Sequence, residues 1–223
     1  MPPKSLPPWL PFVLPFALLL LLSTFDGLPL LTRFYPFWYF VKALALVLTV
    51  LALRRRLPEA RPGGDGLAWA SLVGVLLFFV WIFGDAKTPH FAFLGSRAGY
   101  DPLLAIADSH QRMAFYAVRF LGLAVLVPIA EELFYRGFLL RWVINPDDFR
   151  SVPLGKLTPL SVTVNVLAMA LTHPEWLVAG LFSLAMCLLL SRTKNLFACI
   201  LAHGATNLML GVYILQYHTW AFW

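Results

Sequence analysis

The sequence predicts an all-α fold, a polytopic transmembrane helix bundle. Of its 223 residues, 60% are hydrophobic and only 13% are charged, and the mean hydropathy is +0.77. Soluble domains are about half apolar and about a quarter charged, so this composition is typical of a membrane protein. Apolar runs near the roughly 20 residues needed to cross a bilayer recur along the chain. We therefore expect about seven spans, within a range of six to eight.

The expected spans follow one another along the chain. Residues 1–111 hold about three spans and an interfacial loop, residues 112–217 form a membrane core of about four spans, and residues 218–223 are a short tail. The fourth span is long, and Pro128 predicts a bend in it or a part outside the membrane. The fifth is short for a complete crossing. The segments are 9–25, 36–53, 67–84, 112–141, 159–172, 175–191 and 195–217.

The first segment lacks a small-residue cleavage site, so we expect a retained helix rather than a signal peptide. Lys and Arg placement predicts the orientation, because cytoplasmic loops of membrane proteins are enriched in both. With a cytoplasmic N-terminus, the outer segments hold Arg33, Lys87, Arg97 and Arg112. The inner segments hold the larger set Lys4, Arg54, Arg55, Arg56, Arg61, Arg141, Arg150, Lys156, Arg192 and Lys194. We expect a multi-pass protein of the cell (inner) membrane with its N-terminus in the cytoplasm.

The net charge of +6 raises the question of a nucleic-acid partner. The basic residues cluster at the ends of apolar segments, which is typical of contact with lipid headgroups. We expect the lipid bilayer, and no nucleic acid, as a partner.

The most informative feature is a charged cluster, Glu131, Glu132 and Arg136, in the apolar stretch 120–140. Each charge costs about 2.5–3.5 kcal/mol at membrane depth, so such residues have partners and tasks. Glu132 and Arg136 are spaced i, i+4, the favourable order for an ion pair on a helix. Glu131 lies about 100° around the helix and is predicted to point elsewhere. One carboxylate is thus structural, and the other is a candidate general base.

Three further polar residues fall in two later apolar segments. His173 ends the fifth segment, while His203 and Asn207 are spaced i, i+4 and share a face of the seventh. At about 1.5 Å per residue, Glu131, His173 and His203 lie roughly 12–21 Å from the inner ends of their segments. That depth is the middle third of the bilayer. We therefore expect one shared, hydrated site.

Two chemistries fit this set of residues. In the favoured one, Glu131 and His173 deprotonate a water that attacks a peptide carbonyl, and His203 and Asn207 stabilise the oxyanion; no cofactor is required. In the other, Glu131, His173 and His203 hold a zinc ion that activates the water. The His-Glu-x-x-His zinc motif is absent from the sequence, which favours the metal-free reaction only weakly.

The three motifs resemble those of the CAAX protease and bacteriocin-processing family of intramembrane endopeptidases. The family pattern is Glu-Glu-x-x-x-Arg, Phe-x-x-x-His and His-x-x-x-Asn or Asp. This chain has Glu131-Glu132-LFY-Arg136, Met169-ALT-His173 and His203-GAT-Asn207, in the same order. Met169 replaces the usual Phe, a position at which packing is the expected role.

The resemblance implies the roles that the spacing leaves open. It assigns Glu131 and His173 to water activation, His203 and Asn207 to the oxyanion, and a supporting role to Glu132 and Arg136. The substrate would be a membrane-anchored protein or peptide, lipidated or bearing a sorting signal. Within the family, the chain looks similar to the CAAX prenyl protease-related proteins of exosortase systems. Some schemes class family members as metalloproteases and others as glutamate-type proteases.

Two non-proteolytic functions compete with this interpretation. A non-catalytic binding or immunity protein on the same scaffold would not require all four residues, and a proton-coupled transporter would show inverted repeats or helices broken in both halves.

Three further expectations concern single polar or cysteine positions. We expect Asn165 to form an interhelical hydrogen bond. Glu175 is more typical of a solvated loop acid than of a residue that orients His173. Cys187 and Cys199 are expected to be buried apolar side chains.

Overall fold

The computed structural model describes residues 6–95 and 99–222. Lys4 and Arg97, which contribute to the predicted orientation, lie outside this part of the chain. Throughout the described residues the regular secondary structure is helical, which confirms the predicted all-α class.

The longer helices agree closely with the predicted apolar segments. Several begin at sequence signals for a helix start. Thr158 and Ser161 form a capping box in the first turn of α9, and the Asn195 side chain caps the backbone N–H groups of Phe197 and Ala198 in α11. The α-helices are α1 (Leu10–Ser23), α2 (Pro29–Arg33), α3 (Tyr35–Leu53), α4 (Leu67–Asp85), α5 (Pro102–Ala105), α6 (Ser109–Leu121), α7 (Val127–Glu132), α8 (Leu140–Trp142), α9 (Pro159–Leu171), α10 (Trp176–Thr193) and α11 (Leu196–Tyr217).

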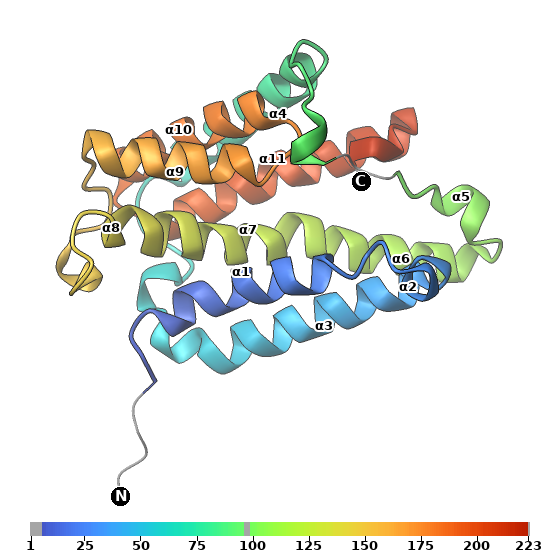
Figure 1. The fold of residues 1–223 in the computed structure, drawn as a ribbon, viewed down its shortest axis with the longest axis horizontal. Helices are drawn as coiled ribbons and strands as arrows, with labels where there is room; N and C mark the ends of the chain where they lie inside the picture. The colour runs from blue at the N-terminus through green and yellow to red at the C-terminus, as the bar shows by residue number, and fades with distance from the viewer. Residues whose placement is uncertain (1–5, 96–98, 223) are drawn as a thin grey trace, which may run out of the picture.

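The continuous helix α6–α7–α8 runs through the middle of the molecule (Figure 1). On one side of it lie α1 and α3, and on the other lie α4, α9, α10 and α11. Helix α11 packs mainly against α4 and against the central helix, while α9 pairs with α10. The central helix, which carries the Glu-Glu motif, therefore has neighbours on both sides.

Within residues 6–95 and 99–222, five helical segments are long and apolar enough to cross a membrane. They are 35–56, 67–85, 109–142, 176–193 and 196–217. The predicted spans 9–25 and 159–172 form α1 and α9, with 14 and 13 residues, which is short of the roughly 20 needed for a crossing. The count of about seven spans is therefore not confirmed, although all seven apolar segments are helical.

The central helix is 34 residues long, or about 51 Å at 1.5 Å per residue, against a hydrocarbon core of about 30 Å. It contains two π-helical turns, Gly122–Leu126 and Leu133–Leu139. Pro128, which lacks an N–H, lies just after the first turn, at the start of α7. The predicted irregularity near Pro128 is thus a π-helical turn within one continuous helix, and π-turns are frequent at functional sites.

Two glycines bring the backbones of neighbouring helices close to α11. A Cβ atom on Gly204 would lie 2.6 Å from the Ala124 carbonyl oxygen in the first π-turn. A Cβ atom on Gly74 of α4 would lie 2.7 Å from the Ala202 carbonyl oxygen of α11. Both distances are closer than side chains tolerate, so glycine is needed for α11 to sit against both neighbours.

Candidate active site

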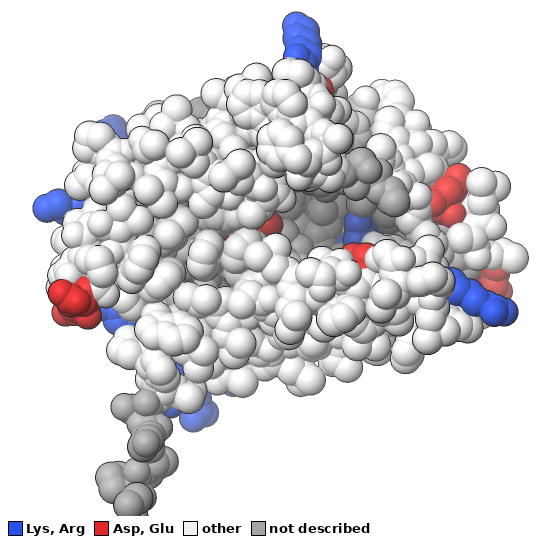
Figure 2. Space-filling view, in the orientation of Figure 1, with Lys and Arg blue, Asp and Glu red and all other residues white. Residues whose placement is uncertain are grey.

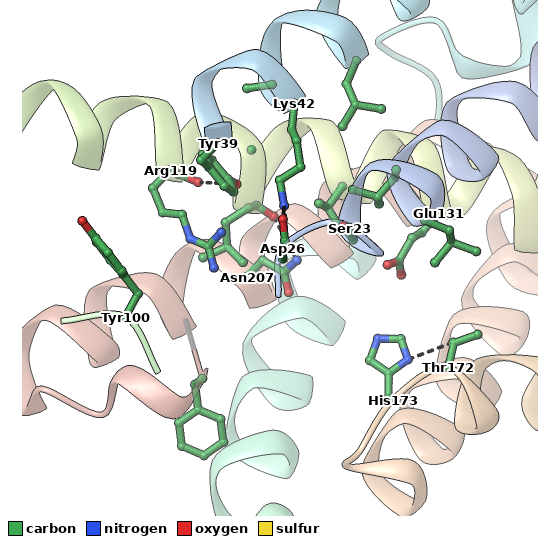
Figure 3. A pocket seen from close by; sticks show the side chains of 18 of the residues that line it. Ser23, Asp26, Tyr39, Lys42, Tyr100, Arg119, Glu131, Thr172, His173 and Asn207 are labelled. Atoms are coloured by element: carbon green, nitrogen blue, oxygen red, sulfur yellow. Dashed lines mark hydrogen bonds and ion pairs between the residues drawn. The ribbon is translucent and has the colours of Figure 1, made fainter. Parts of the chain in front are cut away.

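A cavity of about 690 Å³ opens beside the central helix, and all four predicted site residues line it: Glu131, His173, His203 and Asn207. Figure 2 shows the hollow on one face, with charged atoms visible inside it and mostly uncharged residues around it. Figure 3 shows Glu131 and His173 directed into the same space, one from α7 and the other from the loop after α9. Three segments that are distant in sequence therefore meet at one cavity, as the sequence predicts.

The two adjacent glutamates have different surroundings. Glu131 lines the cavity, and its Oε2 is buried without a hydrogen-bond partner. Glu132 is fully buried outside the cavity lining and contacts Arg136. The division into a cavity-facing and a structural carboxylate agrees with the geometry expected from their 100° separation.

Glu132 connects two of the motifs. Its Oε1 lies 3.3 Å from Arg136 Nη1 and 2.9 Å from His203 Nδ1. The Arg136 guanidinium, which is fully buried, also donates to the Ser183 carbonyl at 3.3 Å and lies 3.5 Å from Met169 Sδ. Met169 thus contacts Arg136 at the position where the related family has Phe. The contact between Glu132 and His203 was not predicted, because i, i+4 spacing says nothing about pairs on different helices.

The backbone fixes the tautomer of His173. This residue follows the last turn of α9, and its Nδ1 lies 2.9 Å from the Met169 carbonyl oxygen. A carbonyl only accepts hydrogen bonds, so Nδ1 carries the proton. In the neutral ring, Nε2 then holds a lone pair and can act as a base or hydrogen-bond acceptor.

His203 and Asn207 are positioned by the central helix. A carboxylate oxygen accepts from His203 Nδ1, so this nitrogen also carries a proton. Asn207 Nδ2 donates to the Leu123 carbonyl at 2.9 Å. Leu123 belongs to the first π-turn, in which the i→i+4 bonding of the α-helix is interrupted. The π-turn therefore supplies the acceptor that anchors Asn207.

Asn165 forms the interhelical hydrogen bonds that the sequence predicts. Its Nδ2 donates to the Tyr135 carbonyl at 2.7 Å, in the second π-turn, and its Oδ1 accepts from Ser183 Oγ at 3.2 Å. The side chain is fully buried. Asn165 thus joins α9 to the central helix and to α10, behind the cavity wall.

Several neighbours of the site were not predicted. Tyr135 Oη lies 3.0 Å from Thr172 Oγ1, which lies 3.1 Å from His173 Nδ1. The Trp81 ring packs against His173 with a centroid separation of 6.1 Å. Glu175, expected to be a solvated acid, is 95% buried in the structure, with 5% exposure. That expectation was wrong because the loop after α9 packs into the bundle instead of extending into solvent.

A protein metal site requires several ligand side chains grouped around one point. Among the described residues, no three His, Cys, Asp or Glu side chains are grouped so that they could hold a metal ion. The set Glu131, His173 and His203 therefore does not form a ready zinc site in this arrangement, in which His203 Nδ1 is directed at Glu132.

The family model for type II CAAX prenyl endopeptidase Rce1-like proteins matches residues 113–209. The matched part, 97 of the 223 residues, is similar to that family. The match contains all three motifs and confirms the resemblance to CAAX proteases. No curated protein and no solved structure shows significant similarity to the chain.

The match to an endopeptidase family supports protease activity, and the apolar helices indicate a membrane protein. The match begins within α6 and ends within α11. It therefore covers every helix that contributes the four predicted site residues, whereas α1, α3 and α4, which also line the cavity, lie before it.

Proposed function

We propose that this protein is an intramembrane endopeptidase in which Glu131 and His173 activate a water molecule without a metal ion. The observation that carries the proposal is the convergence of Glu131, His173, His203 and Asn207 on one cavity inside an apolar bundle. The family match over residues 113–209 supports the reaction class.

Water activation follows from the two groups that share the cavity. His173 Nε2, with its lone pair, accepts a hydrogen bond from the water, and the Glu131 carboxylate takes the proton as oxygen attacks the carbonyl carbon. The carbon–nitrogen bond then breaks, and Glu131 returns the proton to the leaving amine. Glu131 approaches from α7 and His173 from the loop after α9, and both line the one cavity (Figure 3).

The oxyanion requires hydrogen-bond donors on the opposite side of the carbonyl. Asn207 Nδ2 has two hydrogens, of which Leu123 accepts one, and the second is available to the substrate. The second donor is His203 Nε2–H, which requires the ring to carry a proton on both nitrogens, with Nδ1–H donating to Glu132. Loss of one such donor typically slows acyl transfer about 10²–10³-fold.

The same residues define the alternative, a zinc-dependent reaction. It would require His203 to turn away from Glu132, because the present grouping does not form a metal site among the described residues. For this reason we favour the metal-free reaction, and chelation distinguishes the two.

The surrounding bilayer determines the class of substrate. A cavity beneath the lipid surface suits a peptide bond close to a membrane anchor, such as a prenyl group or a transmembrane segment. Lys and Arg placement favours a cytoplasmic N-terminus in the cell (inner) membrane.

The proposal is tested with the purified full-length protein in liposomes. A farnesylated peptide that ends in Cys-aliphatic-aliphatic-X is incubated with the protein, and the products are identified by mass spectrometry. We expect one internal cleavage near the prenylated Cys. Intact peptide after prolonged incubation, together with intact non-prenylated and transmembrane peptides, would contradict an endopeptidase function.

A further inference from the structure

A second group of polar side chains lines the same cavity, apart from Glu131 and His173. It consists of Asp26, Lys42 and Arg119, with the rings of Tyr35 and Tyr39 beside them. Figure 3 shows Asp26, Lys42, Tyr39 and Arg119 gathered in one part of the cavity and Glu131 and His173 in another. The proposed reaction uses none of these residues. We refer to Asp26, Lys42 and Arg119 as the cationic cluster.

Asp26 is engaged closely within this cluster. Its two oxygens lie 2.7 and 2.6 Å from Lys42 Nζ, and Oδ1 also accepts from Trp38 Nε1 at 2.8 Å. Lys42 is almost fully buried, whereas the Asp26 side chain is 35% exposed. The Asp26 carboxylate is therefore bound to two side chains of α3, and it compensates the charge of Lys42.

Arg119 brings a second positive charge to the cavity from α6. Its Nη1 donates to Tyr35 Oη at 3.2 Å, and its guanidinium carbon lies 4.5 Å from the centre of the Tyr39 ring. The hydroxyl and the aromatic ring hold the guanidinium in place while it remains charged. Arg119 also forms part of the cavity wall.

The described residues of the cluster thus combine two cations with one carboxylate, in a wall that is otherwise largely apolar. Because Asp26 already compensates Lys42, the remaining positive charge is that of the Arg119 guanidinium, whose planar geometry and charge match a carboxylate. An intramembrane charge faces a cavity when it has a ligand or a partner to bind.

We propose that the cationic cluster is a subsite for the C-terminal carboxylate of the substrate peptide. The identity of this ligand rests on the proposed function. A peptide cleaved a few residues from its end has its carboxylate about 10 Å from the scissile bond, at roughly 3.3–3.6 Å per residue. Arg119 and Glu131 are twelve residues apart on the central helix, about 18 Å at 1.5 Å per residue, and the Arg119 side chain and the peptide together must cover that distance within the one cavity that both residues line. A lipid phosphate is the competing occupant.

The test measures binding, so that it does not depend on turnover. Full-length protein carrying Glu131→Gln is placed in phosphatidylcholine nanodiscs. The probes are two fluorescent farnesylated peptides that end in Cys-aliphatic-aliphatic-X, one with a free carboxylate and one with a carboxamide. Fluorescence anisotropy gives both dissociation constants, with and without Arg119→Gln. Arg119→Lys tests whether charge alone suffices, and Arg33→Gln, an exposed Arg outside the cavity lining, is the matched control.

We expect the carboxylate peptide to bind about tenfold more tightly or better, the scale of one charge-assisted hydrogen bond. Arg119→Gln should abolish this preference, Arg119→Lys should retain part of it, and Arg33→Gln should leave it unchanged. Equal binding of the two peptides would overturn the proposal. So would an Arg119→Gln variant, still folded by thermal unfolding, that weakens both peptides equally.

Two further outcomes separate the proposals. If phosphatidylglycerol nanodiscs weaken the binding of both peptides alike, and only when Arg119 is present, the ligand is a lipid phosphate and the carboxylate subsite is refuted. If the carboxylate preference is found but wild-type protein cleaves neither peptide, the subsite stands and the endopeptidase proposal fails.

Discussion

Replacing Arg136 by Met tests how the buried charges support the site. Arg136 and Glu132 are both fully buried, and their charged atoms lie 3.3 Å apart. In the variant, the polar contact that remains to the Glu132 carboxylate among the described residues is His203 Nδ1, at 2.9 Å. It also removes the donor to the Ser183 carbonyl.

The expected loss of unfolding free energy follows from this arrangement. Removing one member of a buried ion pair leaves an uncompensated charge and typically destabilises a protein by about 3–5 kcal/mol. Adding Glu132→Gln removes the second charge while retaining an amide oxygen that accepts from His203. We therefore expect the double variant to recover at least half of the lost stability, since replacing both charges of a buried pair is often neutral. Activity should stay low, because His203 no longer has a carboxylate beside it.

Reversible unfolding in mixed detergent micelles measures the free energy of unfolding of both variants. Arg33→Met, at an exposed position, is the control and should change stability by about 0.5 kcal/mol or less. The reasoning is refuted if Arg136→Met is as stable as the control, or if the double variant loses the sum of the two single effects.

Three other predictions test separate parts of the account. Gly204→Ala places a Cβ atom 2.6 Å from the Ala124 carbonyl, so it should destabilise the protein by about 1–3 kcal/mol and reduce peptide cleavage; Gly180→Ala, whose nearest neighbour is 3.6 Å away, should do neither. Asn165→Leu removes the bonds to Tyr135 and Ser183 and should lower the unfolding free energy by about 1–3 kcal/mol, with unchanged stability as the contrary result. Cleavage of the farnesylated peptide should survive prolonged chelation, whereas inactivation with rescue by zinc would support the metal-dependent alternative.

The all-α class and the positions of the longer helices could be predicted because apolar segments and membrane thickness determine them. That Glu131 lines the cavity while Glu132 contacts Arg136 also followed from local helix geometry. The number of crossings was less predictable, since α1 and α9 are apolar helices that end after 14 and 13 residues. Hydropathy alone does not show where such a helix stops.

Most contacts between helices could not be predicted from the sequence. Nothing in the pattern indicates that Glu132 contacts His203, or that Leu123 anchors Asn207, because both depend on how α11 packs against the π-turns. The cationic cluster was missed for a similar reason. Asp26, Lys42 and Arg119 are separated along the chain, and the sequence does not show that they meet, although Lys42 and Arg119 lie inside predicted spans, where a charge needs a partner. The burial of Glu175 likewise depends on the path of a loop.

The central claim is that the Glu131 carboxylate takes the proton from the attacking water. The most direct measurement is the single-turnover cleavage rate of the farnesylated peptide by Glu131→Gln, an isosteric change without a basic oxygen. We expect the rate to fall about 10²–10⁴-fold while peptide affinity and unfolding temperature stay within twofold and a few degrees of wild type. A folded, peptide-binding variant that retains more than half of the wild-type rate would show that this carboxylate is not the base.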